Sequence, residues 1–446
     1  MVELFAQVGQ QVEGLARQLE TQAAALNDLQ ARLAKTSANS SKPPSSDGYA
    51  KPKRTTSLRK PGQKPLGGQP GHRGDPLERV ATPDRTELHP VAAGVQCGTS
   101  LADVAVTAQE ERPVFDIPAI RIEVTAHRAA VKTGPGGGTE NRGVFPVGVS
   151  GPVQSGPGVK PWVTYFQTQH FVPVERTAQI IEDLTGQRVA EATLMKAQRE
   201  CAAAIAPATA AIKAQLRDAP VAHFDESGLR VAGKLPWLPV ASTERLTDHT
   251  VHPQRGQAAM ATAGILPGVA GRAVHDHWKA YFTYAAGPHA LRHAHHLREL
   301  KLIHEPYGQG WAETLAKRLV AMKTAVDTAR DDGQRALPAA AVVAFEQRDE
   351  EALKTGYSVN PRPPPPVGTG GKKRGRPAQP PPLNLLDRLR DFKTETLAFM
   401  HDFRVQFDNH LAERDVRMVK VKPKVSGGFR TPAVAQGFAQ IRDLYD

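Results

Sequence analysis

A heptad repeat in the first 36 residues constrains the fold of this chain more strongly than any other pattern in it. Apolar residues recur every seven positions at Phe5, Val12, Leu19, Leu26 and Leu33. A second set lies between them at Val8, Leu15, Gln22 and Leu29, of which Gln22 alone is polar. Alternating steps of three and four residues are typical of the a and d positions of a coiled coil. We therefore expect residues 1–36 to form a self-associating coiled coil that makes the protein at least dimeric. The alternative is a helix packed on its own domain.

Composition limits the class of protein. The chain has 446 residues, 2 of them Cys. At roughly 150 residues per domain this length suggests about three units, and two cysteines exclude a disulfide framework. The sequence contains no apolar run long enough for a membrane span and no apolar signal-peptide core, so we expect a cytoplasmic protein without a membrane partner. The formal net charge of +12 favours a polyanionic partner.

The segment 37–76 is rich in Ser, Pro and Gly and carries eight Lys or Arg residues against two Asp. Such a stretch cannot bury a core and should stay extended. One interpretation is a solvated linker. The other, which the one-sided charge favours, is an arm that lies along DNA phosphates, through Lys51, Lys53, Arg54, Arg59 and Lys60.

Two further regions lie between residues 77 and 218. Residues 77–145 alternate apolar and polar side chains, as at 114–117 and 120–124, which predicts short strands in a small domain. Residues 146–218 are predicted to be helical, with a turn at 185–187. Two helices joined by a turn are either ordinary packing or a helix-turn-helix that binds DNA.

From residue 219 the pattern is that of a mixed α/β sheet. Short apolar runs predict strands at 221–225, 237–242, 249–252 and 271–276, with a helix at 257–265. Helical sequence follows from 278 to about 353 and, after a basic Pro-rich linker, at 383–403 and 409–421. We expect Pro423 to end the last of these helices, and Thr431 and Pro432 to begin a closing helix.

Three carboxylates stand where such a fold would hold them rigidly and partly open to solvent. Asp225 and Asp276 end the first and fourth predicted strands, and Glu413 lies on a predicted helix. Arg417 and Lys420 follow Glu413 by four and seven residues, so they share its helix face and would meet a DNA backbone there. Three such carboxylates are suited to a pair of Mg²⁺ ions that cleave a phosphodiester.

Each acid also has an ordinary structural explanation. Strand-end Asp residues commonly cap turns, and Glu413 with Arg417 fits a plain i,i+4 ion pair. Four other acids compete by spacing alone, namely Glu226, Asp248, Asp408 and Asp415.

Several longer runs match one known family almost from end to end. They are residues 39–47 (NSSKPPSSD), 67–72 (GGQPGH), 225–228 (DESG), 294–300 (AHHLREL), 407–409 (FDN), 412–420 (AERDVRMVK) and 426–430 (SGGFR). In these runs the chain resembles the transposases of the insertion-sequence 66 family. These are bacterial DDE transposases with a catalytic core like that of ribonuclease H.

The resemblance implies a function and a site. Asp225, Asp276 and Glu413 would be the catalytic, metal-binding triad, and Mg²⁺ or Mn²⁺ would be the cofactor. Lys420 would be the basic residue that follows further along the helix of Glu413. The partners would be the terminal repeats of the element, target DNA and accessory proteins of the same element. The expected location is the bacterial cytoplasm, in association with the nucleoid.

The resemblance also implies an α/β fold with a ribonuclease H-like mixed sheet. The first part of this core would occupy residues 219–310. An all-α insertion, together with the basic linker, would occupy residues 311–382, and the C-terminal part, which carries the last acid, would occupy residues 383–446. Before it would come the coiled coil 1–36, the arm 37–76, the small β-rich domain 77–145 and the helical, candidate DNA-binding region 146–218. Whether the C-terminus is complete at Asp446 is left open.

Two departures from the family pattern concern metals. The family usually has C-x-x-C pairs near 94–97 and 134–137, where this chain has Gly94 with Cys97 and then Gly134 with Gly137. The small domain therefore resembles a zinc-binding domain that has lost its cysteine pairs, and zinc is not expected there. Arg292 stands where the family tends to have Cys, and repeated loss of Cys makes a decayed, inactive copy an alternative.

The run 372–377 (KKRGRP) resembles an AT-hook core. In that interpretation Arg374 and Arg376 lie in a narrow minor groove, because the Gly between them lets the backbone approach closely. The alternative is a solvated basic linker.

Three hypotheses of function remain. The leading one is an enzyme that binds the ends of its mobile element, cuts the strands and joins the 3′-hydroxyls to target DNA with Mg²⁺. The second is a non-catalytic, dimeric DNA-binding protein or a decayed copy of the transposase. A protein that only binds DNA has no use for three acids amid a basic surface. The third is a stand-alone nuclease of the ribonuclease H type, which would not need the coiled coil or the arm.

Overall fold

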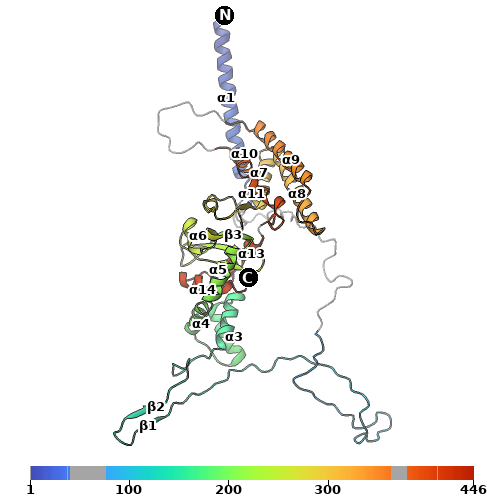
Figure 1. The fold of residues 1–446 in the computed structure, drawn as a ribbon, viewed down its shortest axis with the longest axis vertical. Helices are drawn as coiled ribbons and strands as arrows, with labels where there is room; N and C mark the ends of the chain where they lie inside the picture. The colour runs from blue at the N-terminus through green and yellow to red at the C-terminus, as the bar shows by residue number, and fades with distance from the viewer. Residues whose placement is uncertain (1, 38, 41–76, 363–378, 409, 446) are drawn as a thin grey trace.

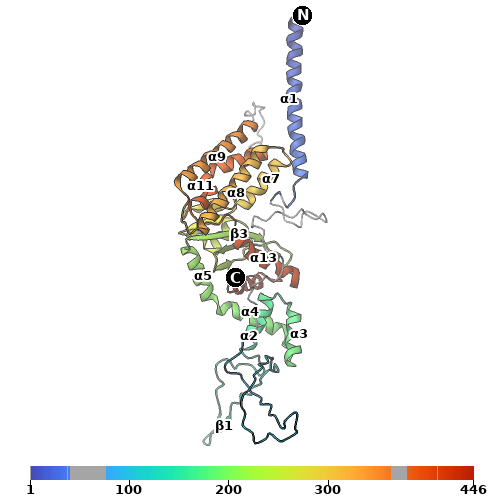
Figure 2. The same cartoon turned by 90° about the vertical axis from the view of Figure 1, so that its right-hand side faces the viewer.

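A computed structural model describes residues 2–37, 39–40, 77–362, 379–408 and 410–445. The molecule is elongated, with helix α1 (Val2–Leu33) projecting at one end and the segment 77–157 at the other (Figures 1 and 2). Between them lie a five-stranded sheet and several helical layers. A mixed α/β architecture is therefore confirmed.

Helix α1 covers almost all of the predicted heptad segment. Its apolar heptad residues are exposed in the single chain, for example Leu15 (60%), Leu26 (59%) and Leu29 (56%). Where α1 contacts the body it uses its other side. Ala31 is fully buried, and Asp28 accepts a hydrogen bond of 3.0 Å from the hydroxyl of Tyr307. Among the helices of the described ranges, none is both long and apolar enough to cross a bilayer.

The central sheet has the strand order β5-β4-β3-β6-β7. Its strands are β3 (Val221–Gly228), β4 (Trp237–Ser242), β5 (Thr247–His249), β6 (Arg272–His275) and β7 (His289–Leu291). Strands β3, β6 and β7 run parallel, whereas β4 pairs antiparallel with both β3 and β5. The predicted strands at 221–225, 237–242 and 271–276 are confirmed. The strand predicted at 249–252 begins two residues earlier, as β5, and β7 is a strand that the sequence patterns missed.

Helices cover both faces of the sheet because the strands are apolar on both sides. On one face, Ala222 and Phe224 of β3 pack with residues of α5 (Ala206–Asp218) and α6 (Gln257–Ala263). On the other face lies α13 (His410–Ser426), which packs on β3 and β4 (Figure 2). Alternation along β3 thus points Asp225 to the α13 face.

A small helical layer precedes the sheet. It contains α2 (Val159–Thr164), a π-helical turn η2 (Tyr165–Gln169), α3 (Val174–Thr185) and α4 (Glu191–Ala204). The predicted turn is present, because Gly186 ends α3 with a left-handed φ of 72° that other residues adopt only with strain. The closing helix α14 (Pro432–Arg442) packs on α4 and β5, capped by the Thr431 side chain, which accepts from the Val434 amide as predicted.

A second helical layer lies on the far side of the sheet, in the upper part of Figure 1. It consists of α7 (His293–His304), α8 (Gly310–Asp331), α9 (Ala339–Val359), α10 (Pro381–Asp391), α11 (Lys393–Thr396) and α12 (Ala398–His401). Leu315, Leu319 and Met322 of α8 are fully buried in its core. The prediction of unbroken helical sequence from residue 278 is wrong, since turns and β7 occupy 278–292.

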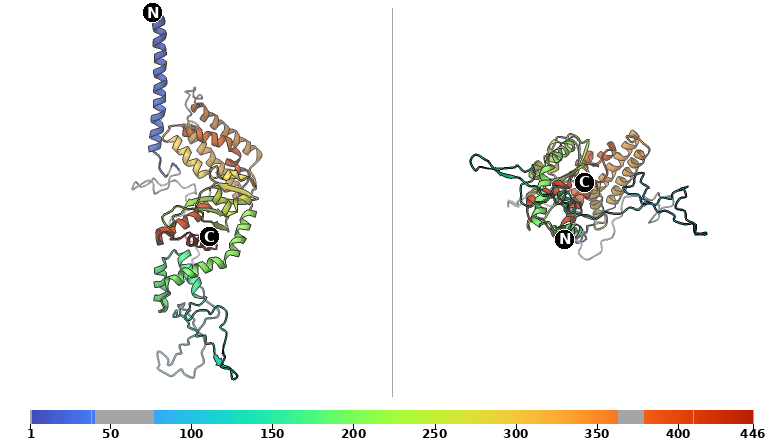
Figure 3. Two further views of the ribbon diagram at one scale, coloured as in Figure 1. Left: turned by 90° about the vertical axis from the view of Figure 1, so that its left-hand side faces the viewer. Right: turned by 90° about the horizontal axis from the view of Figure 1, so that it is seen from below.

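The segment 77–157 differs most from expectation. The strands predicted at 114–117 and 120–124 are absent, and Val114 and Ile117 are 88% and 78% exposed. The regular strands here are β1 (Val131–Thr133) and β2 (Glu140–Arg142), a short hairpin. Figure 3 shows the segment reaching away from the body. Alternation yields a strand only where a partner supplies hydrogen bonds and covers the apolar face, and this segment has neither at 114–124.

Pro423 does not end helix α13 as predicted, because the helix continues to Ser426. Proline lacks an amide hydrogen and removes one hydrogen bond, but so near the end of a helix few later residues depend on that bond.

Candidate active site

Strand register brings two of the three predicted acids to one row of the sheet. His223 of β3 pairs with Val274 of β6, so Asp225 and Asp276 each stand two residues beyond that pair. His275 of β6 pairs with Leu291 of β7, so Asp276 and Arg292 each stand one residue beyond the last pair. Because equivalent positions of parallel strands point to the same face, these three side chains share one edge of the α13 face.

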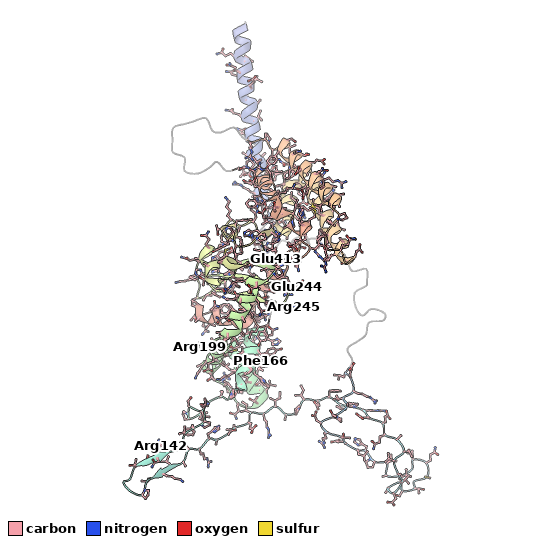
Figure 4. All side chains as sticks on the ribbon, in the orientation of Figure 1. Arg142, Phe166, Arg199, Glu244, Arg245 and Glu413 are labelled. Carbon is pink, nitrogen blue, oxygen red and sulfur yellow. The ribbon has the colours of Figure 1, made fainter. Side chains whose placement is uncertain are left out.

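The third acid reaches the same edge from helix α13. Ala412, Val416 and Val419 of this helix are buried against the sheet. Glu413 lies in the first turn, beside this buried stripe, and its side chain is 29% exposed. In Figure 4, Glu413 lies at the level of the sheet, where the central core meets the upper helical layer. The first turn of a helix also favours a negative side chain.

One guanidinium contacts all three acids. Arg292 Nη1 lies 3.2 Å from Asp225 Oδ2 and 3.3 Å from Glu413 Oε1. Arg292 Nη2 lies 4.0 Å from Asp276 Oδ2. The Arg292 side chain is 5% exposed, whereas the carboxylates are 16 to 29% exposed. The structure therefore gathers Asp225, Asp276 and Glu413 around a single buried positive charge.

Position and charge of Arg292 follow from the local chain. Arg292 comes directly after β7, and its amide donates a 3.2 Å hydrogen bond to the His275 carbonyl, which extends the β6–β7 pairing by one step. Burial by itself would lower the pKa of Arg292, but the three carboxylates outweigh it and raise that pKa. Burial raises the pKa of Asp276, while Arg292 acts in the opposite direction. The guanidinium is thus permanently charged among the acids.

Two of the rival acids are occupied elsewhere. Asp415 is buried on the sheet side of α13, where it accepts a 3.0 Å hydrogen bond from the Thr247 hydroxyl. Asp248 is buried beside Lys213, with 3.5 Å between charged atoms. Asp408 is half-buried just before α13. None of these three carboxylates is among the acids that contact Arg292.

The remaining rival, Glu226, belongs to a separate contact close to the row. It pairs with Arg255, whose guanidinium carbon lies 4.5 Å from the ring centre of Trp237 and 4.1 Å from that of Trp278. Burial raises the pKa of Glu226 to about 7, although Arg255 opposes the shift. Two aromatic rings hold a cation in a fixed place, and the Arg255 side chain is still 44% exposed.

The predicted DNA-binding residues fall into two groups. Arg417 and Lys420 are exposed on α13, on the face that carries Glu413. The others lie outside the described residues, namely Lys51, Lys53, Arg54, Arg59, Lys60, Arg374 and Arg376.

Three carboxylates around one cation are a donor set that suits a hard divalent ion, which prefers oxygen ligands. As arranged, however, they are spread around Arg292. Within the described ranges, no three His, Cys, Asp or Glu side chains lie closely enough together to hold a metal ion. The chemistry of the ligands therefore fits Mg²⁺ or Mn²⁺, and a guanidinium fills the position between them.

Sequence patterns singled out the three acids that the structure brings together, but not the role of Arg292. The residue was noticeable only as a replacement for a Cys, and its contacts depend on β7, which is three residues long. Arg255 was missed as well, because its neighbours Trp237 and Trp278 are distant in sequence.

Comparison with known proteins gives one functional match. The family model described as Transposase IS66 family matches residues 152–437. This range includes the whole sheet, both helical layers and the acid row, by which we mean Asp225, Asp276 and Glu413. A second model, described as a family of unknown function (DUF6444), matches residues 2–78. No curated protein matches the chain.

Proposed function

Since the chain belongs to the IS66 family of transposases, we propose that it cuts and joins DNA at the ends of its own element, using divalent ions held by Asp225, Asp276 and Glu413. The observation that carries the proposal is the convergence of these acids, from β3, β6 and α13, on one cation position. The strand order β5-β4-β3-β6-β7, with helices on both faces, supports a ribonuclease H-like core.

The chemistry consists of two displacements at phosphorus. In the cutting step water attacks the phosphodiester and the 3′-oxygen leaves as a 3′-hydroxyl. In the joining step that hydroxyl attacks a target phosphodiester and displaces another 3′-oxygen. Mg²⁺ or Mn²⁺, when bound, would stabilise the attacking and leaving oxygens. The carboxylates would hold the ions, and exposed Arg417 and Lys420 would bind the phosphates of the strand beside Glu413.

The test is a cleavage and strand-transfer assay with the full chain, Mg²⁺ or Mn²⁺, and DNA carrying the ends that flank its gene, with accessory proteins of the element added in a parallel series. We expect metal-dependent nicks at the element ends, followed by joined products. No products in any series would reject the proposed enzyme activity.

One observation favours a second candidate, a DNA-binding protein that does not cleave. Arg292 fills the cation position between the acids, as expected of a copy that no longer uses metal. Such a protein would need no Mg²⁺ to bind element ends and would release no 3′-hydroxyl.

We further propose that α1 dimerises the protein as a coiled coil. The hydrogen bond to the body uses Asp28, on the side of α1 away from the heptad stripe, and the stripe itself is exposed, so it remains available to a second copy. Burying such a stripe is the main source of stability for an isolated helix of this length.

Replacing Leu15, Leu26 and Leu29 together by Asp should convert the dimer into a monomer, because three charges would enter the helix–helix interface. Sedimentation equilibrium measures the mass. The matched control places three Asp residues off the stripe, at Gln7, Gln10 and Asn27, and should remain dimeric. An unchanged mass in the Leu variant would show that the heptads serve another packing.

DNA binding should depend steeply on salt. Replacing Lys51, Lys53, Arg54, Arg59 and Lys60 together by Gln should weaken binding to all sequences alike. The slope of log affinity against log salt should flatten by about 0.9 for each phosphate that the arm no longer neutralises. Filter binding over a salt series measures both, and Lys317→Gln with Lys354→Gln, on α8 and α9, is the control. A loss confined to element-end DNA would mean that the arm contacts bases.

A further inference from the structure

Arg292 has no other ionic partner in the described part of the chain than the acid row. Its two terminal nitrogens contact Asp225, Glu413 and Asp276, and its buried Nε has no hydrogen-bond partner there. An arginine built into a structural network normally satisfies all of its donors. In the described part of the chain, the hydrogen bonds and ion pairs of this side chain go to the three carboxylates alone.

The acids need this charge in the absence of metal. Three carboxylates that share one edge repel one another, and burial makes that repulsion stronger than in water. A guanidinium suits the task, because its planar fork presents several donors to carboxylates at once. Asp276 illustrates the balance, since burial raises its pKa and Arg292 works against that rise.

A divalent ion and the guanidinium cannot occupy this place together. Mg²⁺ binds carboxylate oxygens at about 2.0–2.1 Å, whereas the oxygens here lie 3.2 to 4.0 Å from the nitrogens of Arg292. To bind an ion the oxygens must move inward, through the space that the guanidinium fills.

On this basis we propose that Arg292 is an internal counter-ion of the acid row, which keeps the three carboxylates together before metal arrives and must withdraw for a divalent ion to bind. The proposal rests on the proposed function, in which the same acids hold the metal. It makes metal binding competitive with an ionic contact inside the protein, so the apparent affinity for the ion equals the intrinsic affinity multiplied by the fraction of molecules in which Arg292 has withdrawn.

The experiment measures Mn²⁺ binding to the full chain without DNA, by calorimetry and by the electron paramagnetic resonance signal of free Mn²⁺. Arg292→Gln removes the charge and keeps hydrogen-bonding capacity. We expect it to bind Mn²⁺ at least about tenfold more tightly than the wild type, the scale of one charge-assisted contact. Arg272→Gln is the matched control, because Arg272 is a partly buried arginine on β6 that pairs with Asp402 and lies apart from the acid row. It should bind as the wild type does.

A second measurement covers the case in which Arg292→Gln is poorly folded. Without metal its melting temperature should be below that of the wild type, and Mn²⁺ should raise it by more than it raises the wild type. Arg292→Lys keeps a charge without the fork and should be intermediate in both respects. Equal Mn²⁺ affinity in wild type, Arg292→Gln and Arg292→Lys would overturn the counter-ion proposal.

The two proposals fail in distinguishable ways. Adding Glu413→Gln to Arg292→Gln should abolish the gain in Mn²⁺ affinity. If the gain persists, the acids are not the metal ligands and the proposed site is wrong. If the gain is absent in Arg292→Gln while Glu413→Gln still weakens binding to the wild type, the proposed site stands and the role of Arg292 is wrong.

Discussion

Glu413→Gln, Asp225→Asn and Asp276→Asn should each slow metal-dependent strand cleavage by about a hundredfold or more, the usual scale for loss of charge stabilisation at a reacting centre. Each substitution keeps the size of the side chain and removes the charge that a divalent ion requires. Binding to element-end DNA should survive, and should become tighter as acidic repulsion is relieved. Gel assays of nicked and joined products, with filter binding in parallel, measure both effects.

The matched control for these variants is Asp415→Asn. Asp415 lies two residues after Glu413 on α13 and is buried against Thr247, from which an amide oxygen can still accept the hydrogen bond. Cleavage should remain within a few-fold of the wild type. Undiminished cleavage in Glu413→Gln, or an equal loss in Asp415→Asn, would refute the assignment of the acids.

The places of the three acids in the fold, at two strand ends and on a helix, were predictable because their signals are local. Asp225 and Asp276 follow short apolar runs, and a run of that kind predicts a strand without knowledge of its neighbours. The helix around Glu413 is equally visible, since Ala412, Val416 and Val419 recur at helical spacing. That the three carboxylates share a cation position could not be predicted, because this depends on the register between β3, β6 and β7.

Arg292 shows where local patterns stop being informative. Strand β7 has three residues, too few for any periodicity, and it forms because β6 supplies hydrogen bonds along its edge. The side chain that contacts every member of the acid row therefore lies directly after the element that the sequence failed to predict.

The error at 114–124 is of the opposite kind. Alternation there resembles that of a strand, yet Val114 and Ile117 are exposed and no neighbouring strand pairs with them in the described structure. Strand pairing depends on burial and partners more than on intrinsic preference.

Phe438 of α14 should be the most sensitive position for stability in the cluster that holds α14 against the sheet. Its ring is 1% exposed and lies 6.1 Å from that of Phe171 and 5.2 Å from that of Phe429. Phe171 follows η2 of the small helical layer, and Phe429 follows α13 and forms a bridge with Val231. One aromatic cluster thus joins that layer to the sheet and to the end of the helix that carries Glu413.

Phe438→Ala should lower the free energy of unfolding by about 3–5 kcal/mol, through lost burial and a cavity that its rigid neighbours cannot fill. For a unit of this size the melting temperature should fall by on the order of 10 °C. Differential scanning calorimetry measures it, with Val434→Ala as control, since that side chain packs on the same cluster but is only partly buried. A loss no larger than that of the control would mean that α14 is not held by this cluster. Cleavage should also be assayed at a temperature at which Phe438→Ala is still folded. If the variant loses the expected stability and also cleaves more slowly there, the cluster also positions Glu413.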